Sequence, residues 1–276
     1  MLVFKLRSES FLKGGLIPFF QISFHTLTVI FLLFRNVMDI VTKKILATFA
    51  KLNQSKYIDI VITTFNRKIY LERCILSILA ASTMPVRIFV GDDYSTDGTH
   101  ELLKEYKQRK RIVDFFVPPQ KAGTANLFNM LINNYVNSKF FIITNDDMWF
   151  RYGYDVQLAT HVNKYYKGLA SMSFYDYTNL KIGKRSHFIE NNLVKTVATG
   201  LGCSLISKVT WDKTTGFKLK VGKTMGFFAS KWCLEANGKH YSIVPPYALH
   251  MDHVTSHLSE RINLGDYIDY RVKHKK

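Results

Sequence analysis

Short apolar runs alternate with longer amphipathic stretches between residues 58 and 147. Four runs rich in β-branched and aromatic residues have the length of buried strands, and the intervals between them contain apolar residues at helical spacing. The expected strands are residues 58–64, 86–90, 112–117 and 140–144, and the helix-spaced residues are Leu71, Ile75, Ile78 and Leu79, then Leu102, Leu103 and Tyr106, then Leu127, Phe128, Leu131 and Tyr135. Strands that alternate with helices pair in parallel through right-handed crossovers. The pattern therefore predicts an α/β fold with a mostly parallel, Rossmann-like sheet flanked by helices.

Polar residues follow three of the expected strands at the point where each strand ends. They occupy residues 63–67, 92–98 and 145–147. Because the carboxyl ends of parallel strands face one edge of a sheet, these residues should meet in a ligand-binding crevice, with Asn66 capping the helix that follows it. Asp146 and Asp147 could bind a divalent cation that neutralises a diphosphate. Paired acids also occur in solvated turns, so the cation-binding interpretation of this pair depends on the neighbouring polar groups.

The three polar segments, together with the segment Gly123 to Asn129, resemble in their order the motifs of glycosyltransferase family 2. The motifs are Thr63-Thr64-Phe65-Asn66-Arg67, Asp92 to Thr99, Gly123 to Asn129, and Asn145-Asp146-Asp147. They cover roughly residues 56 to 150, and their joint order and spacing are more specific than any single motif. The resemblance implies a GT-A fold and an inverting enzyme that uses a nucleotide-diphosphate sugar with Mg²⁺ or Mn²⁺.

The resemblance also implies roles for individual residues. The donor would be bound by Thr63, Phe65, Asn66, Asp93, Lys121 and Asp146. Asp93 would accept a hydrogen bond from the imide N–H of the base, which favours uracil or thymine and hence a UDP-sugar. Lys121 would lie near the phosphates and Asp146 near the ribose or sugar, while Asp147 would be the catalytic metal ligand. Asn145 departs from the pattern, because many members carry another Asp there.

The general base also departs from the family pattern. Relatives carry an acidic pair whose Asp deprotonates the acceptor hydroxyl, but residues 224–228 at the corresponding place contain no carboxylate. We therefore expect Asp212 to be the catalytic base, with Asp176 and Glu235 as alternatives. A degenerate transferase, or a shifted correspondence in this segment, would also explain the missing pair.

A histidine-rich segment follows Pro245-Pro246. Relatives often carry a His-x-Gly-x-x-Ser motif whose His reaches the metal or the diphosphate, and His253 with Ser256 resembles it, although Thr255 replaces the Gly. Imidazole suits Mn²⁺ better than Mg²⁺. We expect His253 to be a second metal ligand, and a solvated loop is the alternative.

The N-terminal segment has the composition of a membrane-associating element. Residues 15–34 contain no Asp, Glu, Lys or Arg, a length that could span a bilayer, although Pro18 and Gln21 dilute its apolar character. Residues 37–51 resemble a basic amphipathic helix at a membrane interface. We expect membrane association and leave open both spanning and a helical hairpin packed on the domain. The expected divisions are a membrane-associating segment (1–55), a GT-A domain (56–262) and a basic tail (263–276).

The net charge of +17 and the three cysteines bear on partners and compartment. No nucleic-acid-binding module is recognisable and the lysines form no single stripe, so an anionic membrane surface is a better partner than nucleic acid. The cysteines lack metal-type spacing and two lie in apolar elements, which indicates core thiols in a reducing compartment. We therefore expect a membrane-associated protein whose catalytic domain is cytoplasmic.

The preferred function is a metal-dependent transfer of a hexosyl or N-acetylhexosaminyl group from a UDP-sugar to a glycan or lipid-linked acceptor, as in polysaccharide biosynthesis. The missing acidic pair motivates an alternative, a non-catalytic nucleotide-sugar-binding scaffold derived from a transferase. A nucleotidyltransferase ranks last, because it would need a Gly-rich basic loop after the first strand, and only Arg67-Lys68 lies there without a glycine.

Overall fold

The computed structural model describes most of the chain and divides it into two compact units. The described residues are 24–174, 187–190, 192–196, 199, 202–219, 225–243 and 246–251. The units are residues 1–41 and 42–276. The expected basic tail at 263–276 lies outside the described residues.

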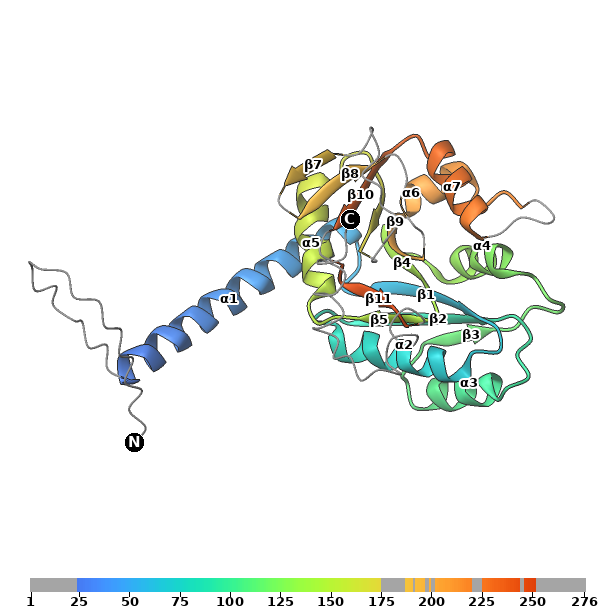
Figure 1. Cartoon of the computed structure of the whole chain (residues 1–276), viewed down its shortest axis with the longest axis horizontal. Helices are drawn as coiled ribbons and strands as arrows, with labels where there is room; N and C mark the ends of the chain where they lie inside the picture. Colours follow the sequence, from blue (N-terminus) through green and yellow to red (C-terminus); the bar gives the residue numbers. More distant parts are fainter. Residues whose placement is uncertain are drawn as a thin grey trace, which may run out of the picture. The chain divides into compact units, whose positions relative to one another are not determined.

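A mixed sheet of nine strands forms the centre of the second unit, in the order β3-β2-β1-β4-β9-β6-β10-β8-β7 (Figure 1). Its strands are β1 (Ile58–Thr64), β2 (Val86–Asp92), β3 (Asp114–Phe116), β4 (Phe140–Asn145), β6 (Leu169–Ser173), β7 (His187–Glu190), β8 (Leu193–Thr196), β9 (Cys203–Ser207) and β10 (Lys239–Ile243). The first four strands pair in parallel, whereas β9 runs antiparallel to β4 and β6. The α/β prediction is confirmed. The third strand is shorter than expected, because its chain joins the sheet only at Asp114.

Seven helices and one small ribbon complete the described structure. The helices are α1 (Phe24–Asn53), α2 (Lys68–Ala81), α3 (Thr99–Gln108), α4 (Thr124–Tyr135), α5 (Tyr154–Tyr165), α6 (Lys208–Thr214) and α7 (Met225–Glu235). The ribbon pairs β5 (Met148–Phe150) with β11 (Ala248–His250) in antiparallel register. β5 follows β4 after only two residues, so the ribbon lies directly beside the carboxyl end of β4.

Alternate residues of the central strands enter two different cores. Ile60 and Ile62 of β1 belong to the core formed with α2, α3 and α5, while Val61 belongs to the core formed with α4, α6 and α7. Phe141 and Ile143 of β4 join Val61 in that second core. Both faces of the sheet are therefore covered, which explains why these strands are continuous apolar runs. Each fully buried side chain of this size contributes roughly 1.5–3 kcal/mol.

The C-terminal part of α1 is built into this domain. Phe49 is fully buried and lies with its ring centroid 6.4 Å from that of Phe140. Asn53 is also fully buried; its Oδ1 accepts the backbone N–H of Phe140 at 2.7 Å, and its Nδ2 donates to the carbonyl of Tyr57 at 3.0 Å. The expected boundary at residue 55 is therefore too late. The compact domain begins near Thr42, since the core requires Phe49.

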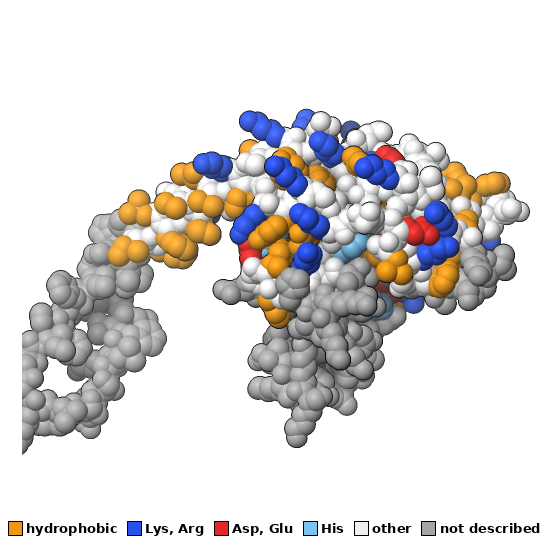
Figure 2. Space-filling model, turned by 90° about the horizontal axis from the view of Figure 1, so that it is seen from above, with side chains coloured by type: hydrophobic (Ala, Val, Ile, Leu, Met, Phe, Trp, Pro, Cys, Tyr) orange, Lys and Arg blue, Asp and Glu red, His pale blue; other side chains and the backbone are white. Residues whose placement is uncertain are grey.

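The preceding part of α1 exposes a large apolar surface. Nine hydrophobic residues here are at least 43% exposed: Ile30, Phe31, Leu32, Leu33, Phe34, Val37, Met38, Ile40 and Val41 (Figure 2). Arg35 and Asp39 interrupt this run. Among the described residues, no helix is both long enough and apolar enough to cross a bilayer. The uncharged stretch at 15–23 lies outside the described residues.

Close packing of α4 on β2 fixes one wall of the crevice described below. A Cβ added at Gly91 would lie 2.6 Å from Cγ of Leu127 and 2.8 Å from Cδ1 of Leu131. Contacts this short cannot be relieved without moving α4, because both leucines are fully buried. Gly91 is therefore required by the close approach of the helix to the strand.

We expect Gly91→Ala to lower the free energy of unfolding by about 1–3 kcal/mol, because it overpacks this contact. Urea unfolding followed by circular dichroism measures the change. Gly202→Ala is the matched control, since among the described residues its Cβ would meet only Nδ2 of Asn145, at an ordinary 3.5 Å. Equal stabilities of the two variants would contradict this account of α4 packing.

Candidate nucleotide and metal site

Two carboxylates are buried side by side in the turn between β4 and β5. Asp146 is 5% exposed and Asp147 is 4% exposed, although they stand at the edge of the sheet. The neighbouring end of β1 contributes Thr64, whose hydroxyl donates to Oδ2 of Asp146 at 2.7 Å. The β5–β11 ribbon adds His250, whose Nε2 lies 3.2 Å from Oδ2 of Asp147. The acidic pair is thus enclosed by three separate segments of the chain.

The two carboxyl groups are in different electrostatic environments. Burial raises the pKa of Asp146 to about 6, and the charge of Asp147 acts in the same direction. Burial also disfavours ionisation of Asp147, but hydrogen bonds and charge interactions with His250 and Arg67 outweigh it and lower the pKa of Asp147. Arg67 forms an ion pair with Oδ2 of Asp147, and its Nη1 lies 3.5 Å from Oδ1 of Asp146. Asp147 therefore holds the negative charge more firmly than Asp146.

The donor atoms around Asp147 fit a divalent cation. Oδ1 of Asp147 is buried and has no hydrogen-bond partner among the described residues, which is costly for a carboxylate unless another ligand binds it. Carboxylate oxygen and imidazole nitrogen are both ligands of Mn²⁺, while Mg²⁺ prefers oxygen. In the described part of the chain no three acidic, His or Cys side chains form a complete metal cluster. A cation at Asp147 would therefore also need oxygens from substrate or water.

A hollow of about 390 Å³ opens onto this acidic pair. It is lined by Thr63, Thr64, Phe65, Arg67, Asp93, Thr124, Leu127, Asn145, Asp146 and Asp147. Thr124 is the first residue of α4, and Gly123 before it has the positive φ of 75° that brings the chain into the helix. Backbone N–H groups at a helix N-terminus favour anions. The hollow therefore has one acidic wall and one wall that attracts anions.

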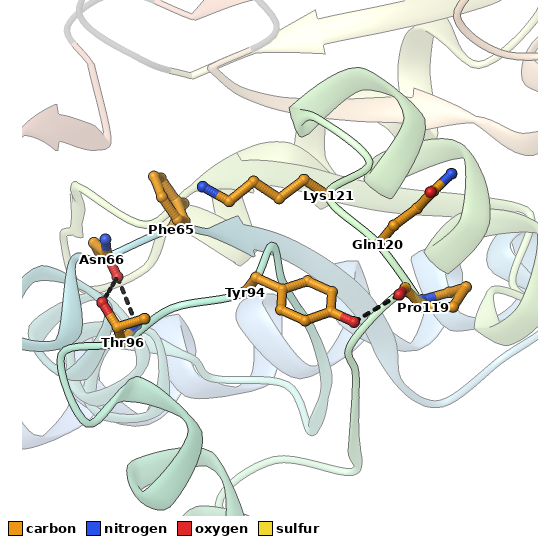
Figure 3. A pocket seen from close by; sticks show the side chains of 7 residues that line it. All are labelled: Phe65, Asn66, Tyr94, Thr96, Pro119, Gln120 and Lys121. Carbon is orange, nitrogen blue, oxygen red and sulfur yellow. Dashed lines mark hydrogen bonds between the residues drawn. The ribbon is translucent and has the colours of Figure 1, made fainter.

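A second hollow of about 550 Å³ shares Phe65 with the first (Figure 3). It lies between the loops that follow β1 and β2 and the loop before α4, and Lys121 extends toward Phe65, with its Nζ 4.0 Å from the ring centroid. Tyr94 crosses the floor and donates from its hydroxyl to the carbonyl of Pro119 at 2.7 Å. Two aromatic rings and a cation can accommodate a flat, partly charged ligand. The position of Lys121 near the phosphates stays a prediction, and in this structure its ammonium lies over the ring of Phe65.

Asp93 holds the loop before α4 in place. One carboxylate oxygen accepts the N–H of Ala122 at 2.7 Å, and the other accepts the N–H of Gly123 at 3.1 Å. A carboxylate offers about four lone-pair positions, so Asp93 can accept a further donor from a ligand. Asp93 therefore has a structural function in addition to the base contact expected from the sequence.

Asn66 and Asp97 fasten the loops after β1 and β2 to each other. Asn66, at φ 51°, accepts the N–H of Thr96 with its Oδ1 at 2.7 Å. Asp97 accepts the N–H of Lys68, the first residue of α2, at 2.8 Å. Asn66 is thus not the helix cap that we expected, since Arg67 holds that position and Asp97 supplies the hydrogen bond from another loop. A carboxylate at a helix N-terminus also complements the helix dipole.

Asp212 lies away from the acidic pair. The last residue of β9, Ser207, pairs with Phe140 at the start of β4, and α6 begins immediately afterwards. α6 therefore leaves the sheet at the amino end of β4, and a strand of this length separates the two edges by roughly 17–20 Å. Asp212 instead forms an ion pair with Lys208 at 2.6 Å. This geometry corrects the expectation that Asp212 is the general base.

The structure brings together most of the other predicted residues. Thr63, Phe65, Asp93, Asp146 and Asp147 line the first hollow, and Asn66 and Lys121 line the second. Asp176 and His253 lie outside the described residues, so their roles stay predictions. Glu235 forms an ion pair with Lys218 at 3.0 Å.

The sequence analysis missed His250 and Arg67 at the acidic pair. His250 could have been found only from the pairing of β11 with β5, which places His250 opposite Met148, directly after Asp147. Arg67 was part of the first motif, but nothing in the motif indicates that its side chain turns toward β4. Both residues contribute nitrogen atoms beside Oδ2 of Asp147.

The raised pKa of Asp146 predicts a pH-dependent cost in stability. Its folded pKa is about 6 against an ordinary 3.8, so between about pH 4 and pH 6 the folded protein retains a proton that the unfolded chain has lost. Stability therefore falls as the pH rises through this window. Asp146→Asn should raise the free energy of unfolding by about 1–3 kcal/mol near pH 8 and by little near pH 4.

Urea unfolding in the presence of chelator at both pH values measures this difference. Asp212→Asn, which removes one exposed carboxylate on α6, controls for the change in net charge. A variant at Asp146 that is less stable than the wild type near pH 8 would contradict the electrostatic assignment.

Comparison with known proteins agrees with this architecture. The model of the family Glycosyl transferase family 2 matches residues 59–218, more than half of the chain. Glycosyltransferase GlyA of Streptococcus pneumoniae serotype 4 is 24% identical over 120 residues, which are 44% of this chain and 17% of that protein. The match therefore spans about a sixth of the relative's length.

Solved structures share the fold at low identity. GalNAc-T7 with UDP, GalNAc and Mn²⁺ superposes with a TM-score of 0.58 at 15% identity, covering 70% of this chain and 43% of that chain. S. aureus TarS 1–349 with UDP-GlcNAc gives 0.53 at 15%, covering 71% and 60%. The mannosyltransferase PcManGT of Pyrobaculum calidifontis with GDP-Man and Mn²⁺ gives 0.51 at 14%, covering 80% and 65%. The expected GT-A fold is confirmed, and the protein belongs to glycosyl transferase family 2.

Proposed function

We propose that this protein is a metal-dependent glycosyltransferase that moves a sugar from a UDP-sugar to a glycan or lipid-linked acceptor, with inversion. The observation that carries the proposal is Oδ1 of Asp147, a buried carboxylate oxygen without a partner among the described residues, in a hollow that shares Phe65 with a second, aromatic hollow. A nucleotide-diphosphate sugar has matching chemistry, with a flat base at one end and a diphosphate at the other.

The two hollows suggest how the donor lies. The base would stack on Phe65 and Tyr94 in the second hollow, and Asp93, which lines the first hollow, retains an acceptor position for an imide N–H. This preference supports UDP, the nucleotide bound by GalNAc-T7 and, as UDP-GlcNAc, by TarS. The diphosphate would lie in the first hollow between the N-terminus of α4 and the acidic pair. By the same neighbours, a hexosyl or N-acetylhexosaminyl group is the transferred sugar.

The metal would be Mn²⁺ or Mg²⁺, held by Asp147 with His250 nearby. When bound, it would neutralise charge that develops on the leaving diphosphate. His250 contributes nitrogen 3.2 Å from Oδ2 of Asp147, and this favours Mn²⁺, which PcManGT and GalNAc-T7 bind. Asp146 accepts the hydroxyl of Thr64 and is oriented toward the same hollow, where it would contact ribose or sugar.

An acceptor at a membrane surface, in the cytoplasm, is the second part of the proposal. The exposed apolar residues of α1 and the exposed Lys43, Lys44 and Lys51 together match an anionic bilayer surface. Lys and Arg side chains are scattered over the face shown in Figure 2 and form no single stripe, which supports a membrane rather than nucleic acid as the partner. Free thiols at all three cysteines agree with a reducing compartment.

A non-catalytic nucleotide-sugar-binding protein is the second candidate. It is favoured by one observation, the position of Asp212 at the opposite edge of the sheet, which leaves the general base unassigned. The scaffold would bind the donor in the same hollows but would not release the nucleotide. Turnover therefore separates the two candidates.

We expect the wild-type protein to release UDP slowly from one member of a panel of UDP-sugars when Mn²⁺ is present, and to stop when chelator is added. Asp147→Asn should reduce this release by at least about 100-fold, because the amide removes the charge while preserving the shape. Release of UDP is measured by chromatography, and circular dichroism checks the fold.

Asp212→Asn is the matched control and should release UDP at the wild-type rate. Donor binding without any release would support the scaffold. Release that is indifferent to chelator, or full activity of the variant at Asp147, would overturn the metal assignment.

We expect the full chain to sediment with vesicles that contain anionic lipid, and a protein beginning at Thr42 to lose most of this binding while keeping its fold and donor affinity. The shortened protein retains Phe49 and Asn53, so its core is complete. A full-length variant with Phe31→Ser and Phe34→Ser tests whether the exposed apolar residues of α1 are themselves required for vesicle binding. If the full chain stays in solution with such vesicles at physiological salt, the membrane proposal fails.

A further inference from the structure

Arg67 reaches the acidic pair from the loop between β1 and α2. It stands at the N-cap of α2, three residues after the end of β1, and its carbonyl accepts the N–H of Leu71 at 2.9 Å. Its guanidinium forms an ion pair with Asp147 and lies 3.5 Å from Oδ1 of Asp146. The side chain is 40% exposed and lies 5.6 Å from the ring centroid of Tyr70. Its backbone is therefore fixed, while its guanidinium is at the mouth of the hollow.

The acidic pair needs a positive charge even when no metal is bound. Asp146 and Asp147 are each at most 5% exposed, and two adjacent buried carboxylates repel each other. Arg67 meets this need at every physiological pH, because a guanidinium does not lose its proton. It does so at Oδ2 of Asp147, so it stands beside the oxygens that a divalent cation would use.

We infer that Arg67 is a displaceable counter-ion, which competes with the divalent cation for Asp147 and moves to the diphosphate of the donor when that cation binds. The inference rests on the proposed function. Arg67 is thus a positioning residue that couples metal binding to donor binding.

Charge and reach support this exchange. A guanidinium and a divalent cation repel each other at one carboxylate, and the exposed side chain of Arg67 can rotate without disturbing a core. Arg67 already lines the hollow that would hold the diphosphate, and its fork of N–H donors matches phosphate oxygens. Metal binding alone breaks the ion pair between Arg67 and Asp147. When a nucleotide also binds, Arg67 forms a new ion pair with the diphosphate. The two ligands should therefore bind with positive coupling.

The test measures Mn²⁺ binding to the full chain by isothermal titration calorimetry, without nucleotide and with saturating UDP. Arg67→Met removes the cation but keeps most of the apolar stem, and Arg67→Lys keeps the charge without the fork. Arg73→Met is the matched control, because Arg73 is an exposed arginine on the same helix. Thermal unfolding in chelator and in Mn²⁺ checks that each variant folds.

In the wild type we expect UDP to tighten Mn²⁺ binding by at least about tenfold. Arg67→Met should bind Mn²⁺ alone at least about tenfold more tightly than the wild type, and UDP should tighten its Mn²⁺ binding by a smaller factor than in the wild type, because only the direct contact between the cation and the diphosphate remains. Arg67→Lys should keep part of the coupling, and Arg73→Met should behave as the wild type. Arg67→Met should also gain more thermal stability from Mn²⁺ than the wild type gains, since its acidic pair lacks a counter-ion in chelator.

Three results would overturn the inference. If Arg67→Met and the wild type bind Mn²⁺ equally, with and without UDP, Arg67 is no competitor, while the proposed metal-dependent function stands. If neither protein binds Mn²⁺ with or without UDP, the metal assignment itself fails and the inference falls with it. If Arg73→Met binds Mn²⁺ as tightly as Arg67→Met does, the effect comes from net charge and the inference is also rejected.

Discussion

Two adjacent carboxylates buried at the end of β4 impose the main physical requirement on this structure. Asp146 and Asp147 are almost inaccessible to solvent, so their charges must be balanced by the protein or by a bound cation. Arg67 supplies a positive charge, while the hydroxyl of Thr64 and the ring nitrogen of His250 approach the carboxylates from two other parts of the chain. The convergence of these segments creates the hollow, so the electrostatic constraint and the shape of the site have the same origin.

The walls of the site are held by bonds between loops more than by the strands themselves. Asn66 binds Thr96, Asp97 binds the N-terminus of α2, and Asp93 binds the loop before α4. Each bond joins segments that come from different strands of the sheet. A substitution in one loop should therefore move its neighbours, which is why residues of a single motif cannot be assigned to binding or to structure alone.

Local pattern was sufficient for the first four strands, because each is a continuous apolar run covered on both faces and followed by polar residues. It failed where the pairing of distant strands decides which edge of the sheet a residue lies at. The antiparallel pairing of β9 places Asp212 at the wrong edge, and the β5–β11 pairing brings His250 to Asp147 across about a hundred residues. The domain boundary failed for a related reason, since the burial of Phe49 depends on its contact with Phe140.

The exit from β1 links the two ends of the proposed donor site. Phe65 is shared by both hollows, and two residues later Arg67 contacts the acidic pair. Between them, Asn66 has a left-handed backbone that turns successive side chains in different directions, and its N–H donates to the hydroxyl of Ser95 at 2.8 Å. A ligand that displaces Phe65 would therefore strain the segment that holds Arg67. Base recognition and charge balance at the acidic pair therefore both depend on one short, cross-linked segment.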